Sequence, residues 1–595
     1  MIQKAQTMRM FDKRRRHTIS PAIQLTAIAA VLLAWTNAGA ADLLGHWPLT
    51  KDANDQRGGM HAMIHGGVAF KDVEGRPAAD FNGRDGFLEV ADNTTLALGA
   101  EDFSLAMWVN PHRPLTGVPG DLISKWSAPQ RRGINLYLSG GSSAYSSICD
   151  TRHIHFGIDE AYVGPEEDHG KPWASNSLIA NLVVFEGQLY AGIADAADPR
   201  DSARVFRLVG GQTWEDCGQI GGGDPTISTV MSMVVHDGKL YAGTGRWDWV
   251  IAKGRSPDNP PPRSTRVYVY EGGQSWRDLG EVGKGSRVLC LGSYNGTLFA
   301  GIDKVGGGHL FRLEGGQWID CGAPDGRNLE CVMPCDGVLY VATHGNLYRY
   351  DGDGNFAPIG LAPHAIEQIH SLHVDAGRLV AGTWPQGYAL RYAGGENWEI
   401  MGRLGLPSET SRINEINALV HHNGKLYAGV IPLSELYRYE VDGHWERLAH
   451  LGRRADWEEA KFPTWVRLTA LASYQGRLFA GTGSCQGRAV DAAVDESLGR
   501  VTSFSFGQMA SFEHDMPAGW SHIAAVRRNG KLAVYVNGEM ASESLEEPDR
   551  PLDVTTTSPL RIGFGGLTYF SGAMSDVRIY RGALSEQEVA ELAHR

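Results

Sequence analysis

A motif that returns seven times constrains the fold of this 595-residue chain more than any other feature. Each copy has an apolar run, a turn ending in glycine, and then Leu-Tyr-Ala-Gly or a close variant, as in residues 417–429. Successive copies lie 40 to 58 residues apart, and most are followed by a second strand pair whose far strand begins at Trp or Phe. The turn glycines are Gly187, Gly238, Gly296, Gly337, Gly377, Gly424 and Gly476. Four short strands per repeat of this length are typical of a β-propeller blade.

The repeats predict a propeller over residues 175–500, most simply one with seven blades. The repeats contain seven inner strand pairs but only six outer pairs, so one blade lacks its usual outer strand. Either Trp173 or the segment 500–506 could complete that blade. Closure with six blades, with seven, or through a mixed blade therefore stays open at this point.

Side-chain types alternate in the strand before each turn glycine. The residue eight positions before the glycine is apolar in every copy, and the residue six before is small in every copy, which predicts one buried column. The positions nine and seven before the glycine are mixed and often polar. We interpret these as lining the central channel, and they include Arg287, Gln368, Glu415 and Arg467, then Glu330, His370 and Asn417.

The channel positions are the candidate functional site. Charged groups that converge in a concavity are a common feature of active sites, although a wet channel also tolerates any polar residue. If the protein is an enzyme, we expect Glu330 or Glu415 to be a general acid with a raised pKa near the arginines. The catalytic candidates are Glu330, Glu415, Arg287, Arg467 and His370, and the binding candidates in the channel are Gln368 and Asn417.

The first 40 residues predict export. A basic segment, 13–16, precedes an apolar run from about residue 23 to 35 and the small-x-small tripeptide Ala38-Gly39-Ala40. We expect a signal peptide over residues 1–40, cleaved near Ala40, and a secreted, periplasmic or cell-surface protein. The apolar run is too short for a membrane span, and no later run is longer. A formal net charge of −13 argues against a nucleic-acid partner.

Seven cysteines are an odd number, so at least one must be free or pair outside the chain. We predict a disulfide between Cys321 and Cys331, which stand close together between two blades. Because Cys290 and Cys331 share the small, buried column, buried thiols are the alternative. The sequence contains no pair of CxxC motifs, so it does not predict a structural zinc site.

Alternating apolar residues with N-G and D-G turns predict antiparallel sheet on both sides of the repeats. Residues 41–160 contain, in order, W-P-L, A-N-D-x-x-G, D-F-N-G and S-x-x-x-W-V. This stretch resembles the concanavalin A-like lectin/glucanase superfamily in its LamG-like jellyroll branch. Segments that resemble the closing strands of the same jellyroll lie in residues 501–595, with a capping box at 585–588 that predicts a short helix.

The resemblance implies an all-β protein in which one LamG-like jellyroll sandwich is split by an inserted propeller. A propeller is circular, so its ends lie side by side and it can replace a loop. We therefore expect the strand near 104–109 to share a sheet or core with the strands near 523–526 and 577–580. The alternative is two small β domains, one on each side of the propeller.

The resemblance also implies a structural calcium ion, because carboxylates of the first loop and the last strand are its usual ligands in this branch. The positions to test are Asp52, Asp55 and Asp576. Turn formation is the other explanation, above all for Asp55.

Family resemblance favours a non-catalytic protein that binds a glycan or an extracellular polysaccharide, or that mediates adhesion. One alternative is a sialidase-like glycoside hydrolase or lyase acting in the channel, although the nearest glucanase-type motif, Glu513-His-Asp515, lacks its second Glu. Another is a protein-binding propeller with Trp247 and Trp249 of a long rim loop as its hot spot.

Overall fold

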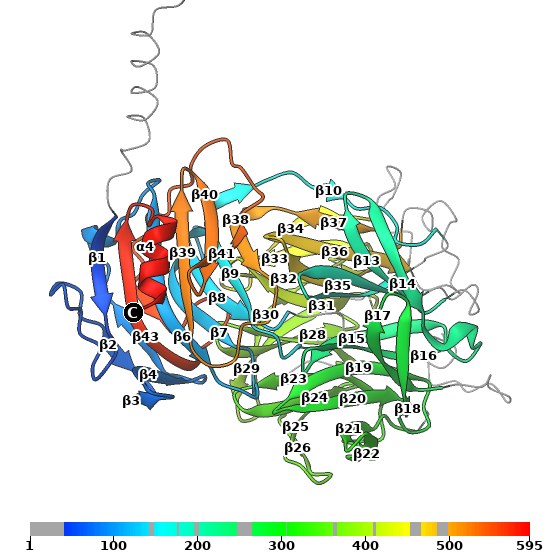
Figure 1. The fold of residues 1–595 in the computed structure, drawn as a ribbon. Helices are drawn as coiled ribbons and strands as arrows, with labels where there is room; N and C mark the ends of the chain where they lie inside the picture. Colours follow the sequence, from blue (N-terminus) through cyan, green and yellow to red (C-terminus); the bar gives the residue numbers. More distant parts are fainter. Residues whose placement is uncertain are drawn as a thin grey trace, which may run out of the picture.

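The computed structural model contains two all-β bodies side by side, a jellyroll sandwich and a propeller (Figure 1). It describes residues 41–141, 148–174, 178–194, 202–246, 264–304, 306–360, 366–407, 412–452, 466–484 and 498–595. Within these ranges, no helix combines the length and apolar character needed to cross a membrane.

The jellyroll has two antiparallel sheets that each combine strands from before and after the propeller. The first has the order β3-β4-β43-β6-β39-β40-β41, with β1 also paired to β43. Its strands are β1 (Asp42–Trp47), β3 (Val68–Val73), β4 (Arg76–Asn82), β6 (Phe103–Pro111), β39 (Ser521–Arg528), β40 (Lys531–Val536), β41 (Glu539–Glu543) and β43 (Ser571–Arg581).

The second sheet has the order β2-β5-β42-β7-β8-β9-β38 and faces the propeller. Its strands are β2 (Met63–His65), β5 (Phe87–Val90), β7 (Gly120–Ser127), β8 (Arg132–Ser139), β9 (His153–Val163), β38 (Phe506–Phe512) and β42 (Leu560–Ile562). Between the sheets lies one apolar core, whose large side chains include Trp47, Phe81, Phe103, Phe156 and Phe570.

Strand β6 confirms that the two halves form one sandwich. Ala106 of β6 lies opposite Ala524 of β39, and Leu105 lies opposite Ile579 of β43. Because β6 is hydrogen-bonded on both sides by strands from the other end of the chain, neither half has a core of its own. Two separate β domains are thereby excluded.

The propeller has seven blades within the described residues, six of them built from consecutive strands. The first blade comprises β11 (Leu178–Phe185), β12 (Gln188–Ala194), β13 (Arg204–Gly210) and β14 (Thr213–Gln219), and the second comprises β15 (Thr229–His236), β16 (Lys239–Gly245), β17 (Arg266–Gly272) and β18 (Ser275–Glu281). The third comprises β19 (Arg287–Tyr294), β20 (Thr297–Asp303), β21 (Leu310–Glu314) and β22 (Gln317–Asp320), and the fourth comprises β23 (Leu329–Cys335), β24 (Val338–Thr343), β25 (Leu347–Tyr350) and β26 (Phe356–Pro358). The fifth comprises β27 (Gln368–Asp375), β28 (Arg378–Trp384), β29 (Tyr388–Gly394) and β30 (Asn397–Arg403), and the sixth comprises β31 (Glu415–His422), β32 (Lys425–Ile431), β33 (Glu435–Tyr439) and β34 (Trp445–His450).

The seventh blade is mixed and closes the ring. Its inner strands β35 (Val466–Tyr474) and β36 (Arg477–Ser484) are followed by β37 (Val501–Phe504), and its outermost strand is β10 (Glu167–Asp168). Of the two candidates for completing this blade, the segment 500–506 supplies its third strand. Trp173 instead stacks on Phe206 of the first blade, with ring centroids 5.8 Å apart.

A β-bulge interrupts the inner hairpin of every blade at the same place. The pairing register shifts between the residues eight and six before the turn glycine, and the residue between them has no partner in the ladder. Bulges redirect side chains and commonly lie next to functional sites. The bulged residues are Ala180, Met231, Leu289, Glu330, His370, Asn417 and Thr469.

The predicted disulfide between Cys321 and Cys331 is wrong. Both cysteines are free and buried, as are the other four in the described ranges. The Cys331 thiol points to the next blade and lies 3.7 Å from the Ile369 carbonyl oxygen, whereas Cys321 turns toward Arg312 of its own blade. Although the two cysteines are close in sequence, they belong to different blades, and their side chains point to different partners.

The predicted C-terminal helix is present as α4 (Glu586–Ala593). Its capping box is formed by Ser585, which accepts from the Glu588 amide, and by Glu588, which accepts from the Ser585 amide at 2.7 Å. Val589 and Leu592 bury the helix against the outer face of the first sheet. The helix thereby covers part of the jellyroll surface opposite to the propeller (Figure 1).

The hairpin turns of the propeller contact the second jellyroll sheet. The Asn423 side chain donates to the carbonyl oxygens of Ile158 and Phe506, at 3.2 and 3.0 Å. The backbone N–H of Gln475 donates to Glu513 Oε1 at 2.5 Å. These bonds hold the hairpin turns of the propeller on the sandwich.

Candidate functional site

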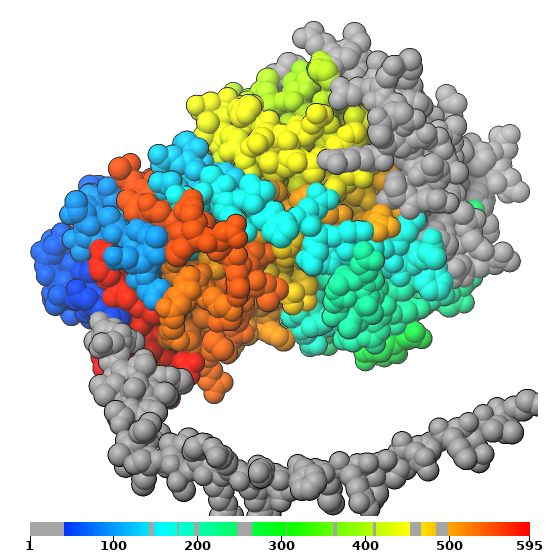
Figure 2. All heavy atoms as spheres, turned by 90° about the horizontal axis from the view of Figure 1, so that it is seen from above, coloured from blue at the N-terminus to red at the C-terminus, as the bar shows by residue number. Residues whose placement is uncertain are grey.

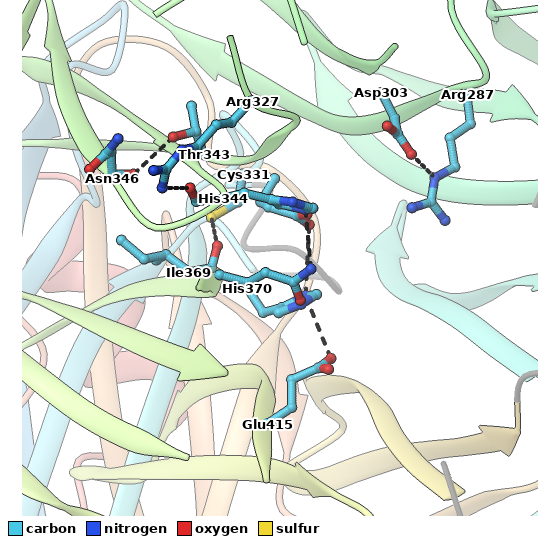
Figure 3. Close-up of polar contacts among 12 residues, drawn as sticks. Arg287, Asp303, Arg327, Cys331, Thr343, His344, Asn346, Ile369, His370 and Glu415 are labelled. Carbon is cyan, nitrogen blue, oxygen red and sulfur yellow. Dashed lines mark hydrogen bonds and ion pairs between the residues drawn. The ribbon is translucent and has the colours of Figure 1, made fainter. Parts of the chain in front are cut away.

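The polar channel positions come from the innermost strands of five neighbouring blades. Bulges in β23 and β27 direct Glu330 and His370, and β31 and β35 contribute Glu415 and Arg467. Except for the partly exposed Gln368, all the sequence-predicted channel residues are buried. Most of them meet in one chain of contacts, of which Figure 3 shows the part around His370 and Glu415.

That chain alternates acidic and basic groups. His344 Nε2 is hydrogen-bonded to Glu330 Oε1, and Glu330 Oε2 lies 3.7 Å from His370 Nδ1. His370 Nδ1 is 3.5 Å from Glu415 Oε1, which also accepts from Arg467 Nη1 at 3.1 Å. We call these five residues the channel network. Each carboxylate in it lies between two cationic or protonatable side chains.

The two binding candidates are also engaged inside the channel network. Gln368 Oε1 is 2.5 Å from His370 Nε2, and its amide nitrogen is 3.3 Å from His344 Nε2. Asn417 donates to Glu415, while its Oδ1 lies 3.4 Å from Arg467 Nη1. A ligand in the channel would have to displace bonds that these amide groups already make.

Arg287 is hydrogen-bonded to a carboxylate outside this chain, although its positive charge also acts to lower the pKa of Glu330. Its Nε donates to Asp303 Oδ2 at 3.1 Å, on the far side of the channel view in Figure 3. The structure therefore joins four of the five catalytic candidates and gives the fifth a different carboxylate partner.

The sign of the pKa shift at Glu330 is opposite to the prediction. Burial by itself would raise the pKa of this carboxyl, but the charges of His344 and His370 and the His344 hydrogen bond outweigh burial and lower it to about 2. Burial likewise favours neutral His344, yet Glu330 raises the pKa of this histidine above its ordinary value. Glu330 is ionised near neutral pH, so it has no proton to donate as a general acid.

Carboxyl groups with raised pKa values lie elsewhere in the molecule. Burial raises the pKa of Asp121 to about 7 and that of Glu513 to about 8, although both accept backbone N–H bonds. Glu513 is buried against the seventh blade, while Asp515 pairs with Arg113 at 3.0 Å. The two acids of the glucanase-like motif thus turn to different partners.

Sequence reasoning missed Asp303 and His344. Both stand seven residues after a turn glycine, Gly296 and Gly337, at the end of the second strand of a blade. The position seven after the turn glycine lies opposite the position nine before it in the strand ladder, since Arg287 pairs with Asp303. Reading the alignment forward as well as backward would have found both residues.

The carboxylates proposed for calcium have separate partners. Asp55 accepts four backbone N–H groups, from His46 and Arg57 at Oδ1 and from Gly59 and Met60 at Oδ2. Asp52 accepts from the Asn54 amide at 3.0 Å.

Asp576 Oδ1 is 2.6 Å from His46 Nε2 and 2.9 Å from Arg578 Nε. Neither these three carboxylates nor any other His, Cys, Asp or Glu side chains in the described ranges gather into a metal-binding group of three. The donor set does not fit a shared cation, and Asp55 instead organises the first loop.

Residues 462–590 match the family described as the concanavalin A-like lectin/glucanases superfamily. The second half of the jellyroll is thus similar to this superfamily. The matched range begins just before β35 of the seventh blade and ends in α4, so it covers the second half of the concanavalin A-like jellyroll. No curated protein matches the chain.

Several solved structures resemble the chain at low identity. YCF48 from Cyanidioschyzon merolae is 11% identical, with a TM-score of 0.39, over 57% of this chain and 99% of that one. Virginiamycin B lyase from Staphylococcus aureus is 8% identical, with a TM-score of 0.40, over 57% and 99%. The WD40 propeller domain of Doa1 is 10% identical, with a TM-score of 0.38, over 58% and 97%.

Trp247 and Trp249, the candidates for a protein-binding hot spot, lie outside the described residues. That prediction therefore stays a prediction.

Proposed function

We propose that this chain is an exported, non-catalytic carbohydrate-binding or adhesion protein whose ligand is a glycan or an extracellular polysaccharide. The concanavalin A-like jellyroll supports a binding role. The observation that carries the proposal is the state of the channel network. Its carboxylates are buried and bonded to histidine or arginine, and the pKa of Glu330 is lowered to about 2.

Glycoside hydrolysis needs one protonated and one ionised carboxyl on either side of the scissile bond. In the channel, Glu330 is ionised and held by His344, which opposes the first of these roles. The acids whose pKa is raised to about 7 and 8, Asp121 and Glu513, are buried at the domain boundary, where one oxygen of each accepts backbone N–H bonds. Asp159, whose pKa is raised to about 6, is paired with Arg131 and also lies outside the channel. Because the carboxyl groups with raised pKa values lie outside the channel, the channel lacks a general acid, and this favours binding over turnover.

The test combines a glycan array with affinity electrophoresis and a reducing-sugar assay on the mature protein. A binding protein is expected to be retarded by at least one polysaccharide and to release no sugar from it. Release of monosaccharide or of shortened chains would overturn the proposal. Export is tested separately, by mass spectrometry of the secreted chain, which is expected to begin near Ala41.

One observation favours a second candidate function, a polysaccharide lyase. The His344–Glu330 pair resembles the base-and-orienter arrangement of proton-abstracting sites, since Glu330 raises the pKa of the histidine. A lyase would generate ultraviolet-absorbing unsaturated products from a uronic-acid polymer, and His344→Ala would abolish them. Absence of such products from a panel of acidic polymers would leave binding as the function.

A further inference from the structure

A cleft of about 720 Å³ lies between the jellyroll and the sixth and seventh blades. Its jellyroll wall includes Arg131, in the turn between β7 and β8, and Val163 at the end of β9. Its propeller wall is formed by residues of β33 and β34. Figure 2 shows these two regions, cyan and yellow, side by side on the surface. The volume is within the range of about 300–1,000 Å³ that is usual for small-molecule sites, which occur preferentially at domain interfaces.

Two guanidinium groups in the walls of this interdomain cleft are held in fixed positions by bonds within the protein. Arg438 is 3% exposed and bonds to Glu440, at 2.5 Å, and to Glu446. Arg131 bonds to Asp159 and to the Tyr162 carbonyl oxygen, both at 2.9 Å. Of the groups around Arg438, the side chain of Glu446 is 53% exposed and is therefore open to a ligand.

The charges of the cleft are balanced. Its walls carry three arginines and three glutamates, so no cationic surplus attracts an anion. Arg447 is paired with Glu435 at 2.6 Å, in addition to the pairs that Arg131 and Arg438 make. A neutral ligand whose groups both donate and accept hydrogen bonds fits these walls, and sugar hydroxyl groups have that property.

The floor of the cleft is apolar. Phe504 and Phe506 stack with ring centroids 6.0 Å apart and planes 3° from parallel, and the Arg438 guanidinium lies 5.8 Å from the Phe506 ring. Val163 stands at the mouth and is 61% exposed. Apolar walls with a few polar groups that fix orientation are the usual composition of a small-molecule site.

We propose that the interdomain cleft binds a neutral oligosaccharide. The inference rests on the proposed function and names a site and a ligand class for it. Neither the jellyroll nor the propeller has this site alone, because Arg131 and Val163 come from one body and Arg438 and Glu446 from the other. The insertion of the propeller therefore creates the binding site.

The experiment measures binding of four probes by titration calorimetry to the full mature chain: cellohexaose, laminarihexaose, mannohexaose and an acidic oligogalacturonate. Val163→Trp fills the mouth of the cleft. Val209→Trp is the matched control, since Val209 is also 61% exposed but lies on β13 of the first blade. We expect Val163→Trp to weaken binding of a neutral probe at least about tenfold and Val209→Trp to change it less than about twofold.

A second variant keeps the result independent of steric effects. Glu446→Gln removes a charge from the partner of Arg438, while Glu399→Gln does the same in a comparable ion pair with Arg378. The two glutamate side chains are 53% and 52% exposed, so neither change should affect folding. Binding is expected to weaken about threefold in Glu446→Gln only, the loss typical of one hydrogen bond.

Each outcome distinguishes the site from the function. If a neutral probe binds and the two cleft variants bind it as the controls do, the cleft is not the site, although the protein still binds glycans. If only oligogalacturonate binds, the argument from balanced charge is wrong. If no probe binds and the glycan array is also blank, the proposed function and this inference fall together.

Discussion

The channel network and the domain boundary are both polar and buried, yet they treat their polar groups in opposite ways. In the channel, Glu330 and Glu415 are ion-paired with His344, His370 and Arg467. At the boundary, burial lowers the pKa of histidines such as His421 and holds them neutral. The difference teaches that a cluster of charges in a concavity can be structural, whereas a cleft of balanced charge between two bodies can bind a ligand.

The largest effect should come from acidifying the boundary. Burial lowers the pKa of His153 and His422 to about 3 and that of His373 to about 4, and it lowers those of His155 and His421 well below the ordinary value. The unfolded chain takes up protons below about pH 6.5 while the folded chain does not. Each histidine therefore costs on the order of 1.4 kcal/mol of stability per pH unit below that point.

Buried carboxyls at the boundary, among them Asp336 and Asp375, have raised pKa values and oppose this trend. Burial raises the pKa of Asp121 to about 7, that of Glu513 to about 8 and that of Asp159 to about 6, so they stabilise the fold as pH falls through this range. Because all five histidines take up a proton on unfolding in this range, urea midpoints are still expected to decline from pH 6.5 to pH 5. The channel differs, because Glu330 loses its contribution only as pH falls from about 4.5 toward 2. A flat profile between pH 6.5 and 5 would contradict the neutral state of the histidines.

The next largest effect should come from breaking the channel network. Glu415→Leu leaves buried Arg467 and His370 without their shared carboxylate and should cost about 3–5 kcal/mol of unfolding free energy. Adding Arg467→Leu should restore part of it, since the unpaired charge is then removed. Urea unfolding of the single and double variants provides the measurement. If the double variant is less stable than either single one, the two side chains do not act as a buried ion pair.

A smaller effect is expected at the hairpin that holds the propeller on the jellyroll. Asn423→Ala removes two bonds to the jellyroll, whereas Asn295→Ala changes an exposed residue at the same turn position. Both native residues have positive φ, 43° and 48°, so the backbone penalty cancels in the comparison. The difference in unfolding free energy should be about 1–3 kcal/mol, the cost of leaving buried carbonyl groups unpaired. Equal stability of the two variants would show that the boundary does not depend on this side chain.

The smallest effect is expected in ligand binding when the channel is changed. Gln368→Ala should alter the affinity for the neutral oligosaccharide less than about twofold, because its amide oxygen is already engaged by His370. Calorimetry of this variant beside Val163→Trp compares the two regions directly. A tenfold loss in Gln368→Ala with none in Val163→Trp would move the ligand from the cleft to the channel.

The sequence predicted the architecture because its signals are local or repeated. The apolar column that begins with Ile179 and the small column that begins with Asn181 are buried in all seven blades. The pairing of β6 with β39 and β43 was predictable since motifs of a single fold stand in order on both sides of the repeats.

The bulges and the cleft were not predictable in this way. A bulge changes hydrogen bonding without a fixed residue type, as Ala180, Glu330 and Asn417 at the same position illustrate. The cleft joins Arg131, Val163 and Glu446, which no periodicity relates, and only the docking of two bodies brings them together. The sign of the Glu330 shift was missed for a similar reason, since His344 comes from a different strand end.

Strand β10 has a consequence for how the chain assembles. Strand β6 must find β39 across more than 400 residues, and the entropy lost on closing a loop increases with its length. Once the ring closes, however, Glu167 is hydrogen-bonded opposite Ser503, and the whole propeller becomes a short, rigid connection between the two halves of the sandwich. The entropy lost when β6 pairs with β39 is then comparable to that of closing an ordinary loop. We therefore expect propeller closure to precede formation of the sandwich, and a chain that fails to place β10 to be left with two incomplete sheets whose edges are open to aggregation.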